Sequence, residues 1–118
     1  MAYMLLIMED PAQRGTRTEA QGREVFQRMV DWSQDLKQRG VLRAVESLAS
    51  PDRRAARVQV REGKPRLIDG PFAEAKEMVG GFFLVDVPSR EEAIALAREC
   101  PAAAWATVEV RETGPCFL

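Results

Sequence analysis

The alternation of apolar and polar residues along the first third of the chain predicts a strand followed by a helix. Residues 3–8, YMLLIM, form a continuous apolar run short enough for a buried strand. Between residues 25 and 36, apolar side chains recur every three or four positions, as on one face of a helix. The sequence TEAQ at 18–21 predicts a capping box near the start of this helix, and Gly40 is expected to end it.

The rest of the chain shows strand patterns on either side of a second helical pattern. Residues 57–61, RVQVR, alternate strictly, which predicts a strand with one face in water. Ser89 and Glu92 predict a second capping box, at the start of a helix that ends at Cys100. The other expected elements are a strand at 41–48, a hairpin turn at 62–64 with a return strand at 65–68, and strands at 81–87 and 107–111.

This order of elements predicts an α+β, ferredoxin-like split βαβ fold with an inserted β-hairpin, in a single domain spanning residues 1–118. In that fold the strands at 3–8 and 81–87 are central, and both are apolar on nearly both faces. Two helices cover only one face of such a sheet, whereas a strand that is apolar on both faces needs burial on both. We therefore expect a homodimer with facing sheets, which is a dimeric α/β barrel. The alternative is an apolar patch that binds a different partner.

Composition and charge narrow the class of protein. The chain has 118 residues, a net charge of −1 and a pI of about 5.6, so no overall basic field favours direct nucleic-acid binding. Its two cysteines lack a metal-ligand or CxxC spacing, which favours a reduced, cytoplasmic setting. The apolar run at 2–8 is too short to cross a membrane and lacks the basic start of a signal peptide, so no membrane partner is expected.

The segment IDGPFAEAKEMVGGFF, residues 68–83, carries the densest charge pattern of the chain. Aspartate in a turn usually accepts the N–H group two residues on, but for Asp69 that residue is Pro71, which has none. Its carboxylate is therefore directed to another backbone group or to a ligand. If the following residues are helical, Glu74 and Glu77 share a face and could act as an acid–base pair. If they are extended, Glu74 and Lys76 form a surface ion pair instead.

The absence of histidine restricts the available chemistry. It excludes Ser-His and Cys-His nucleophile systems and argues against a transition-metal site, so no cofactor is predicted. An oxygen-only Mg²⁺ or Ca²⁺ site built from Glu9, Asp10, Glu74 or Glu77 is the alternative left open. The charged pair Glu9-Asp10 itself is expected to mark the point where the first strand reaches water.

Several of these strings resemble the DGPF-domain family, also called the YCII-related family. They are YMLLIM, VQVREGK, DGPFAEAKEMVGGFFLVDVPSREEAIALARECPAA and the closing VEVR, which together cover nearly the whole chain. The resemblance implies a homodimeric, ferredoxin-like α/β barrel. It does not imply a reaction, because the His-Asp mechanism proposed for the broader group needs a histidine. The residues it assigns to the family signature are Asp69, Gly70, Pro71, Phe72, Glu74, Lys76, Glu77 and Gly81.

Two functions follow as hypotheses. In the first, the homodimer binds a small anionic or carbonyl-bearing metabolite in a cleft near the DGPF turn, and loop 10–23 acts as a lid whose Arg14 and Arg17 suit an anion. The second is a non-catalytic interaction or regulatory module, because some family members are associated with extracytoplasmic-function sigma factors. The sequence does not decide whether the chain is an enzyme. The catalytic candidates are Asp69, Glu74, Lys76 and Glu77, and the ligand-binding candidates are Arg14, Gly70, Pro71, Phe72 and Gly81.

Overall fold

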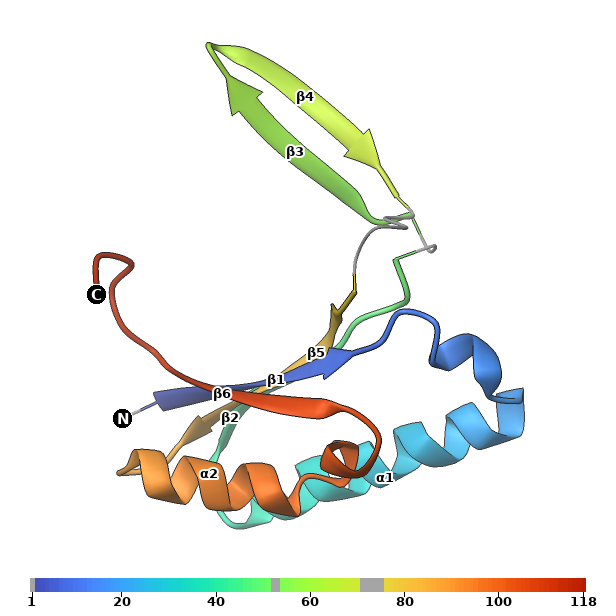
Figure 1. Cartoon of the computed structure of the whole chain (residues 1–118). Helices are drawn as coiled ribbons and strands as arrows, with labels where there is room; N and C mark the ends of the chain where they lie inside the picture. The colour runs from blue at the N-terminus through green and yellow to red at the C-terminus, as the bar shows by residue number, and fades with distance from the viewer. Residues whose placement is uncertain (1, 52–53, 71–75) are drawn as a thin grey trace.

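The computed structural model describes residues 2–51, 54–70 and 76–118, and in them the elements follow the predicted order (Figure 1). The main deviation is that the strand predicted at 81–87 begins earlier, at Met78, and ends at Asp86. The elements are β1 (Ala2–Glu9), η1 (Arg14–Thr16), α1 (Glu19–Gln38), β2 (Leu42–Ser47), β3 (Ala56–Arg61), β4 (Lys64–Asp69), β5 (Met78–Asp86), α2 (Arg90–Glu99), η2 (Pro101–Ala104) and β6 (Thr107–Glu112).

Four strands form one sheet in the order β2-β5-β1-β6, and each neighbouring pair is antiparallel. This is the ferredoxin-like arrangement predicted from the sequence, with the two apolar strands β1 and β5 at its centre. Both long helices lie against the same face of the sheet (Figure 1). Strands β3 and β4 form a separate two-stranded sheet, the inserted hairpin.

Local sequence signals fix both ends of α1. At its start, the Thr18 side chain accepts the Gln21 N–H while the Gln21 side chain accepts the Thr18 N–H, which confirms the predicted capping box. At its end, Gly40 adopts a positive φ of 75°. The N–H groups of Gly40 and Val41 then donate to the carbonyls of Lys37 and Leu36, at 3.0 and 3.2 Å. This Schellman motif satisfies carbonyls that the helix leaves open.

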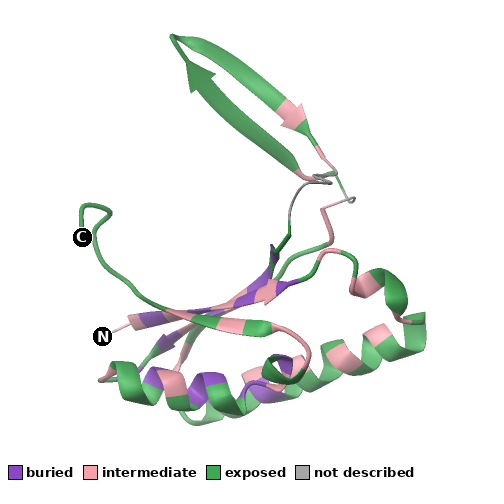
Figure 2. Ribbon diagram, in the orientation of Figure 1, coloured by how far each residue is buried: buried purple, intermediate pink, exposed green. Residues whose placement is uncertain are grey.

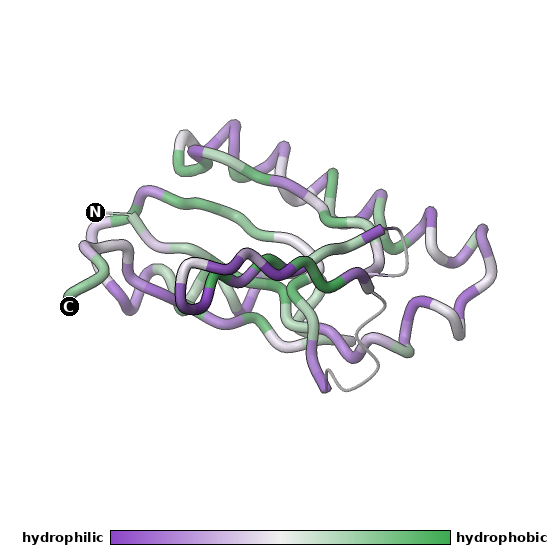
Figure 3. The backbone as a smooth tube through the Cα atoms, turned by 90° about the horizontal axis from the view of Figure 1, so that it is seen from above, coloured by the Kyte–Doolittle hydropathy of each residue, from purple (hydrophilic) through white to green (hydrophobic). Residues whose placement is uncertain are grey.

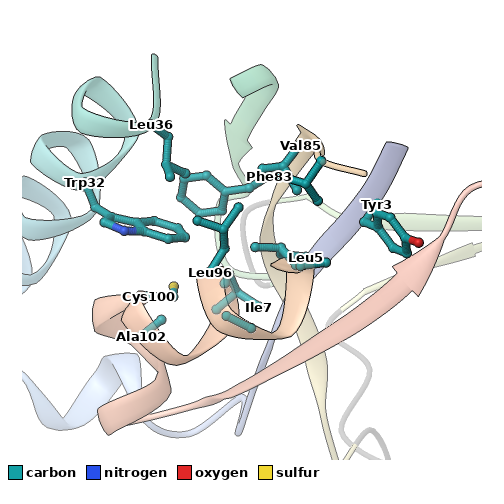
Figure 4. Close-up of a cluster of buried hydrophobic side chains, with 13 residues drawn as sticks. Tyr3, Leu5, Ile7, Trp32, Leu36, Phe83, Val85, Leu96, Cys100 and Ala102 are labelled. Carbon is teal, nitrogen blue, oxygen red and sulfur yellow. The ribbon is translucent and has the colours of Figure 1, made fainter. Parts of the chain in front are cut away.

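The hydrophobic core lies between the two helices and one face of the sheet (Figure 2). Alternate residues of β1 point into it, and among them Leu5 is fully buried. From α1, Trp32 and Leu36 pack against the sheet, and the Trp32 ring meets Phe83 edge-on with centroids 4.8 Å apart (Figure 4). The predicted helical stripe is therefore buried in the second half of α1, where this contact lies.

The opposite face of the sheet is apolar at its centre, and no helix of the described chain covers it (Figure 1). Residues on this face are only partly buried, which reflects contact with their neighbours in the sheet rather than a covering layer. The pairing places Met4, Leu6 and Met8 of β1 beside Leu84, Phe82 and Val79 of β5. We call this surface the free sheet face.

Strands β3 and β4 form an arm, residues 56–69, that leaves the body on the side of the free sheet face and lies over it (Figures 1 and 3). Its two-residue turn, Glu62-Gly63, has positive φ at both positions, as a tight hairpin of this twist needs. The apolar side chains Val58, Val60 and Leu67 are 68%, 57% and 64% exposed. The arm also explains why the radius of gyration is 16.1 Å, above the roughly 13.5 Å expected for a compact chain of this length.

None of the helices in the described ranges combines the length with the apolar character that a membrane-spanning helix needs.

Candidate functional site

A cavity of about 600 Å³ lies between the first half of α1 and the end of the sheet where β1 finishes and β5 begins. Its walls are mainly apolar. The apolar residues that form them include Val25, Phe26, Met29 and Val30 of α1, Phe83 of β5, and Trp105 after η2. The apolar stripe of α1 thus has two roles, since its second half packs in the core and its first half borders this cavity.

A buried ion pair forms one end of the cavity. Glu9, the last residue of β1, is only 8% exposed, and its carboxylate accepts from Arg14 Nε at 2.9 Å and from Arg14 Nη2 at 3.2 Å. Arg14 also donates to the carbonyls of Leu48, at 2.7 Å, and Gly80, at 3.3 Å. One guanidinium therefore ties together the end of β1, the residue after β2 and the start of β5.

The Gly80-Gly81 pair makes room for this arrangement. The register between β1 and β5 slips here, so that Ile7 pairs with Gly81 while Gly80 is an extra residue, a β-bulge. A Cβ at Gly80 would collide with the Glu9 carboxylate and lie 2.9 Å from Arg14 Nη2. A Cβ at Gly81 would lie 2.7 Å from the carbonyl oxygen of Glu46. The space that these glycines leave open is therefore occupied by other atoms of the chain itself.

Arg17 and Trp105 form the rim of the cavity. The guanidinium carbon of Arg17 lies 6.0 Å from the centroid of the Trp105 ring, which is within the range of a cation–π contact. Gln13 holds the backbone of this tryptophan, because its Nε2 donates to the Trp105 carbonyl at 2.8 Å. The loop before α1 thus contacts Trp105 through two side chains, Gln13 and Arg17.

The predicted ligand-binding residues Arg14 and Gly81 both lie in the cavity wall. Arg14, however, already donates four hydrogen bonds within the chain, so the loop that carries it is pinned to the sheet. The loop therefore does not have the freedom of a lid at Arg14. The ligand-binding roles of both residues stay predictions.

The predicted catalytic residues are placed differently. Asp69 ends β4, and Lys76 and Glu77 precede β5; all three are exposed and none lines the cavity. Gly70 donates its N–H to the Ala55 carbonyl at 2.7 Å, and it too lies outside the cavity wall. The predictions for Pro71, Phe72 and Glu74 lie outside the described residues. The catalytic and binding roles assigned to this segment stay predictions.

The interpretation of Glu9-Asp10 as the end of a strand in water is half wrong. Asp10 is exposed, but Glu9 is buried because Arg14, five residues later, supplies the opposite charge. In the part of the chain that the structure describes, no group of three carboxylate or cysteine side chains gathers as a metal site would require. The apolar stripe of the first helix serves both the core and the cavity wall, and the 54% exposure of Phe26 shows that the core does not use it all.

Comparison with known proteins places the chain in a family. The model of the YCII-related domain matches residues 1–115. An uncharacterized protein of Rhizobium meliloti (strain 1021) is 30% identical over 99 residues, which are 84% of this chain and 79% of that protein. The match spans the β1 strand, the cavity and the DGPF segment alike. The chain therefore belongs to the YCII-related family.

Proposed function

We propose that this protein binds a small molecule in the cavity between α1 and the sheet. The observation that carries the proposal is the form of the cavity, whose apolar walls end at a buried Glu9–Arg14 pair. Small-molecule sites are typically concave and apolar with a few well-placed polar groups, and a volume of about 600 Å³ lies within the roughly 300–1,000 Å³ usual for them.

Hydrogen bonds within the chain hold the walls of the cavity in place. The hydrogen bonds of Arg14 hold the loop after β1 against Leu48 and Gly80, and the hydrogen bond from Gln13 holds Trp105. A ligand therefore does not have to order these groups when it binds, which reduces the entropic cost of association. The site thus favours a small ligand that fits an existing shape.

A thermal-shift screen against small metabolites tests this proposal. A ligand that binds only the native state raises the melting temperature by mass action. The variant Val25→Phe should fill part of the cavity and abolish the shift, whereas Gln34→Phe adds the same ring to an exposed position of α1 and should leave it intact. A ligand shift that survives in Val25→Phe would place binding elsewhere and overturn the proposal.

We further propose that the chemistry, if the site is catalytic, uses the carboxylates and lysine of the DGPF segment. The candidates are Asp69, Glu74, Lys76 and Glu77. The charge pattern of the sequence supports these candidates, whereas the described ones among them do not line the cavity. The variant Asp69→Asn therefore tests whether this turn takes part in function. If it binds the screened ligand as the wild type does, Asp69 has no role in ligand binding; loss of turnover of that ligand in the same variant would support the catalytic role, and unchanged turnover would exclude it.

A homodimer through the free sheet face, closing a dimeric α/β barrel, is the proposed assembly of the single domain. The partly exposed Leu6 and Phe82 at the centre of that face support it, and the arm stands on the same side (Figures 1 and 3). Facing sheets pack about 10 Å apart, while six-residue strands reach about 20 Å, so the arm is long enough to extend past a second sheet.

Sedimentation equilibrium tests the assembly. Leu6→Lys places a charge at the centre of the free sheet face and should yield monomers, whereas Arg23→Lys, on the exposed surface of α1, should remain dimeric. A wild-type protein that sediments as a monomer at all concentrations would exclude the homodimer. The exposed apolar side chains of the arm favour a second candidate function, that of an interaction module. A stable complex of the monomer with another protein would support it.

A further inference from the structure

We propose that the cavity takes an anion with an apolar body and that Arg17, rather than Arg14, binds its charged group. This inference rests on the proposed function and adds the chemical class of the ligand. It follows from asking which polar groups around the cavity still have hydrogen-bonding capacity to offer.

The Glu9–Arg14 pair has little capacity left. Both carboxylate oxygens of Glu9 accept from Arg14, and the remaining Arg14 bonds go to the carbonyls of Leu48 and Gly80. The two charges also neutralise one another, with Nε and Oε2 only 2.9 Å apart. A ligand that reaches this end of the cavity meets a compensated pair instead of a free charge.

Two other polar residues of the wall are also committed. Ser33 donates its hydroxyl to the Val30 carbonyl of its own helix at 2.7 Å. Glu46 pairs with Phe82, whose side chain belongs to the free sheet face, so its carboxylate lies on the side of the sheet away from α1. Neither residue offers a charge to the interior of the cavity, and Ser47, a further polar residue of the wall, has only an uncharged hydroxyl.

Arg17 differs from all of these. Within the described ranges it donates no hydrogen bond and forms no ion pair, and its guanidinium carbon lies over the Trp105 ring, 6.0 Å from the centroid. This cation–π contact keeps the guanidinium beside the ring while its N–H groups remain available. A guanidinium held in this way is suited to a planar carboxylate or a sulfonate, which it binds through paired N–H donors.

The apolar walls of the cavity indicate the chemical character of the rest of the ligand. Val25, Met29 and Val30 of α1 and Phe83 of the sheet present hydrocarbon surface, which favours an apolar or aromatic body. The Trp105 ring also lines the cavity and lies 6.0 Å from the guanidinium carbon of Arg17, so it can contact the body near the anionic group. The geometry therefore assigns the charged end of the ligand to the rim and the apolar end to the interior.

Two fluorescent probes with similar bodies test this assignment. 8-Anilinonaphthalene-1-sulfonate carries the anion, and N-phenyl-1-naphthylamine has the same ring system without it. The wild type should bind the sulfonate with a Kd at least about tenfold lower, or ~1.4 kcal/mol. Arg17→Gln should remove that difference while leaving the neutral probe unaffected. Arg23→Gln, an arginine of α1 outside the cavity, should bind both probes as the wild type does.

The outcomes separate the inference from the proposed function. If the neutral probe binds the wild type, is excluded by Val25→Phe, and the sulfonate binds no tighter, the cavity is a binding site but the preference for anions is wrong. If Arg17→Gln weakens both probes equally, Arg17 supports the wall and does not bind the anion, which also overturns the inference. If neither probe binds, or Val25→Phe binds both unchanged, the cavity itself is not the site and the proposed function fails with it.

Discussion

The Glu9–Arg14 pair should contribute far more to stability than the surface ion pairs of α1, and a double-mutant cycle measures the difference. The two side chains are 10% and 28% exposed, against 80% and 78% for the Glu19–Arg23 pair. Breaking a fully buried pair costs about 3–5 kcal/mol. Because Arg14 is partly exposed, we expect about 2–3 kcal/mol for Glu9→Met. Arg14→Met should cost somewhat more, since two carbonyls also lose their donor.

The double variant Glu9→Met, Arg14→Met should cost less than the sum of the two single changes, because it leaves no uncompensated charge. We expect a coupling energy of about 2 kcal/mol from urea unfolding followed by circular dichroism. The same cycle on Glu19 and Arg23 should give about 0.5 kcal/mol or less. All variants must be compared at one protein concentration, since any self-association would add to the apparent stability. Equal coupling energies for the two pairs would refute the buried role of Glu9.

Four further predictions concern Gly80, Thr18 and Cys100. Gly80→Ala should destabilise the protein by about 1–3 kcal/mol in urea unfolding, because the new methyl group meets the Glu9 carboxylate. The control Gly15→Ala, with open space around its Cβ, should change stability by less than ~0.5 kcal/mol. Equal effects of the two variants would contradict the steric argument. Thr18→Ala should cost about 1 kcal/mol through the lost cap, and an unchanged urea midpoint would show that the cap is dispensable. Burial raises the pKa of the Cys100 thiol, so at pH 8 Ellman's reagent should modify exposed Cys116 first, and equally fast labelling of both would show that Cys100 is accessible. The native state holds the Cys100 proton more tightly than the unfolded state does. The stability that this adds is present below the ordinary thiol pKa and is lost as the pH rises through the raised pKa of Cys100. Above about pH 8.5, the urea midpoint should therefore fall less in Cys100→Ala than in the wild type.

The fold could be predicted because most of its signals are local. The capping box at Thr18 and the glycine at 40 act within a few residues, and both formed as the sequence indicated. The hairpin turn at 62–63 is equally local. The order of elements predicted that β1 and β5 lie at the centre of the sheet, and their apolar character on both faces agrees with that place.

The site was harder to predict because its contacts join distant parts of the chain. Nothing near Glu9 in the sequence shows that Gly80 lies against its carboxylate. The sequence pattern therefore predicts that Glu9 is in water, whereas the structure buries it. The cavity walls in α1 follow the same helical spacing as the core, so their pattern could not separate the two environments. The DGPF segment has the densest charge pattern of the sequence, yet its described charged residues Asp69, Lys76 and Glu77 lie outside the cavity wall. Of the described residues of this segment, the wall takes only Gly80, Gly81 and Phe83.

The contact between Gly80, Glu9 and Arg14 has a consequence for how this sequence can change. A side chain at position 80 is blocked as long as the carboxylate of Glu9 occupies the space beside it. Loss of Glu9 alone would leave the Arg14 charge without its partner. The three positions should therefore accept substitutions only in a certain order, with the ion pair exchanged for an apolar pair before the glycine can be replaced. Relatives that keep the acid and the arginine are expected to keep the glycine, and those with another residue at 80 should have lost both charges.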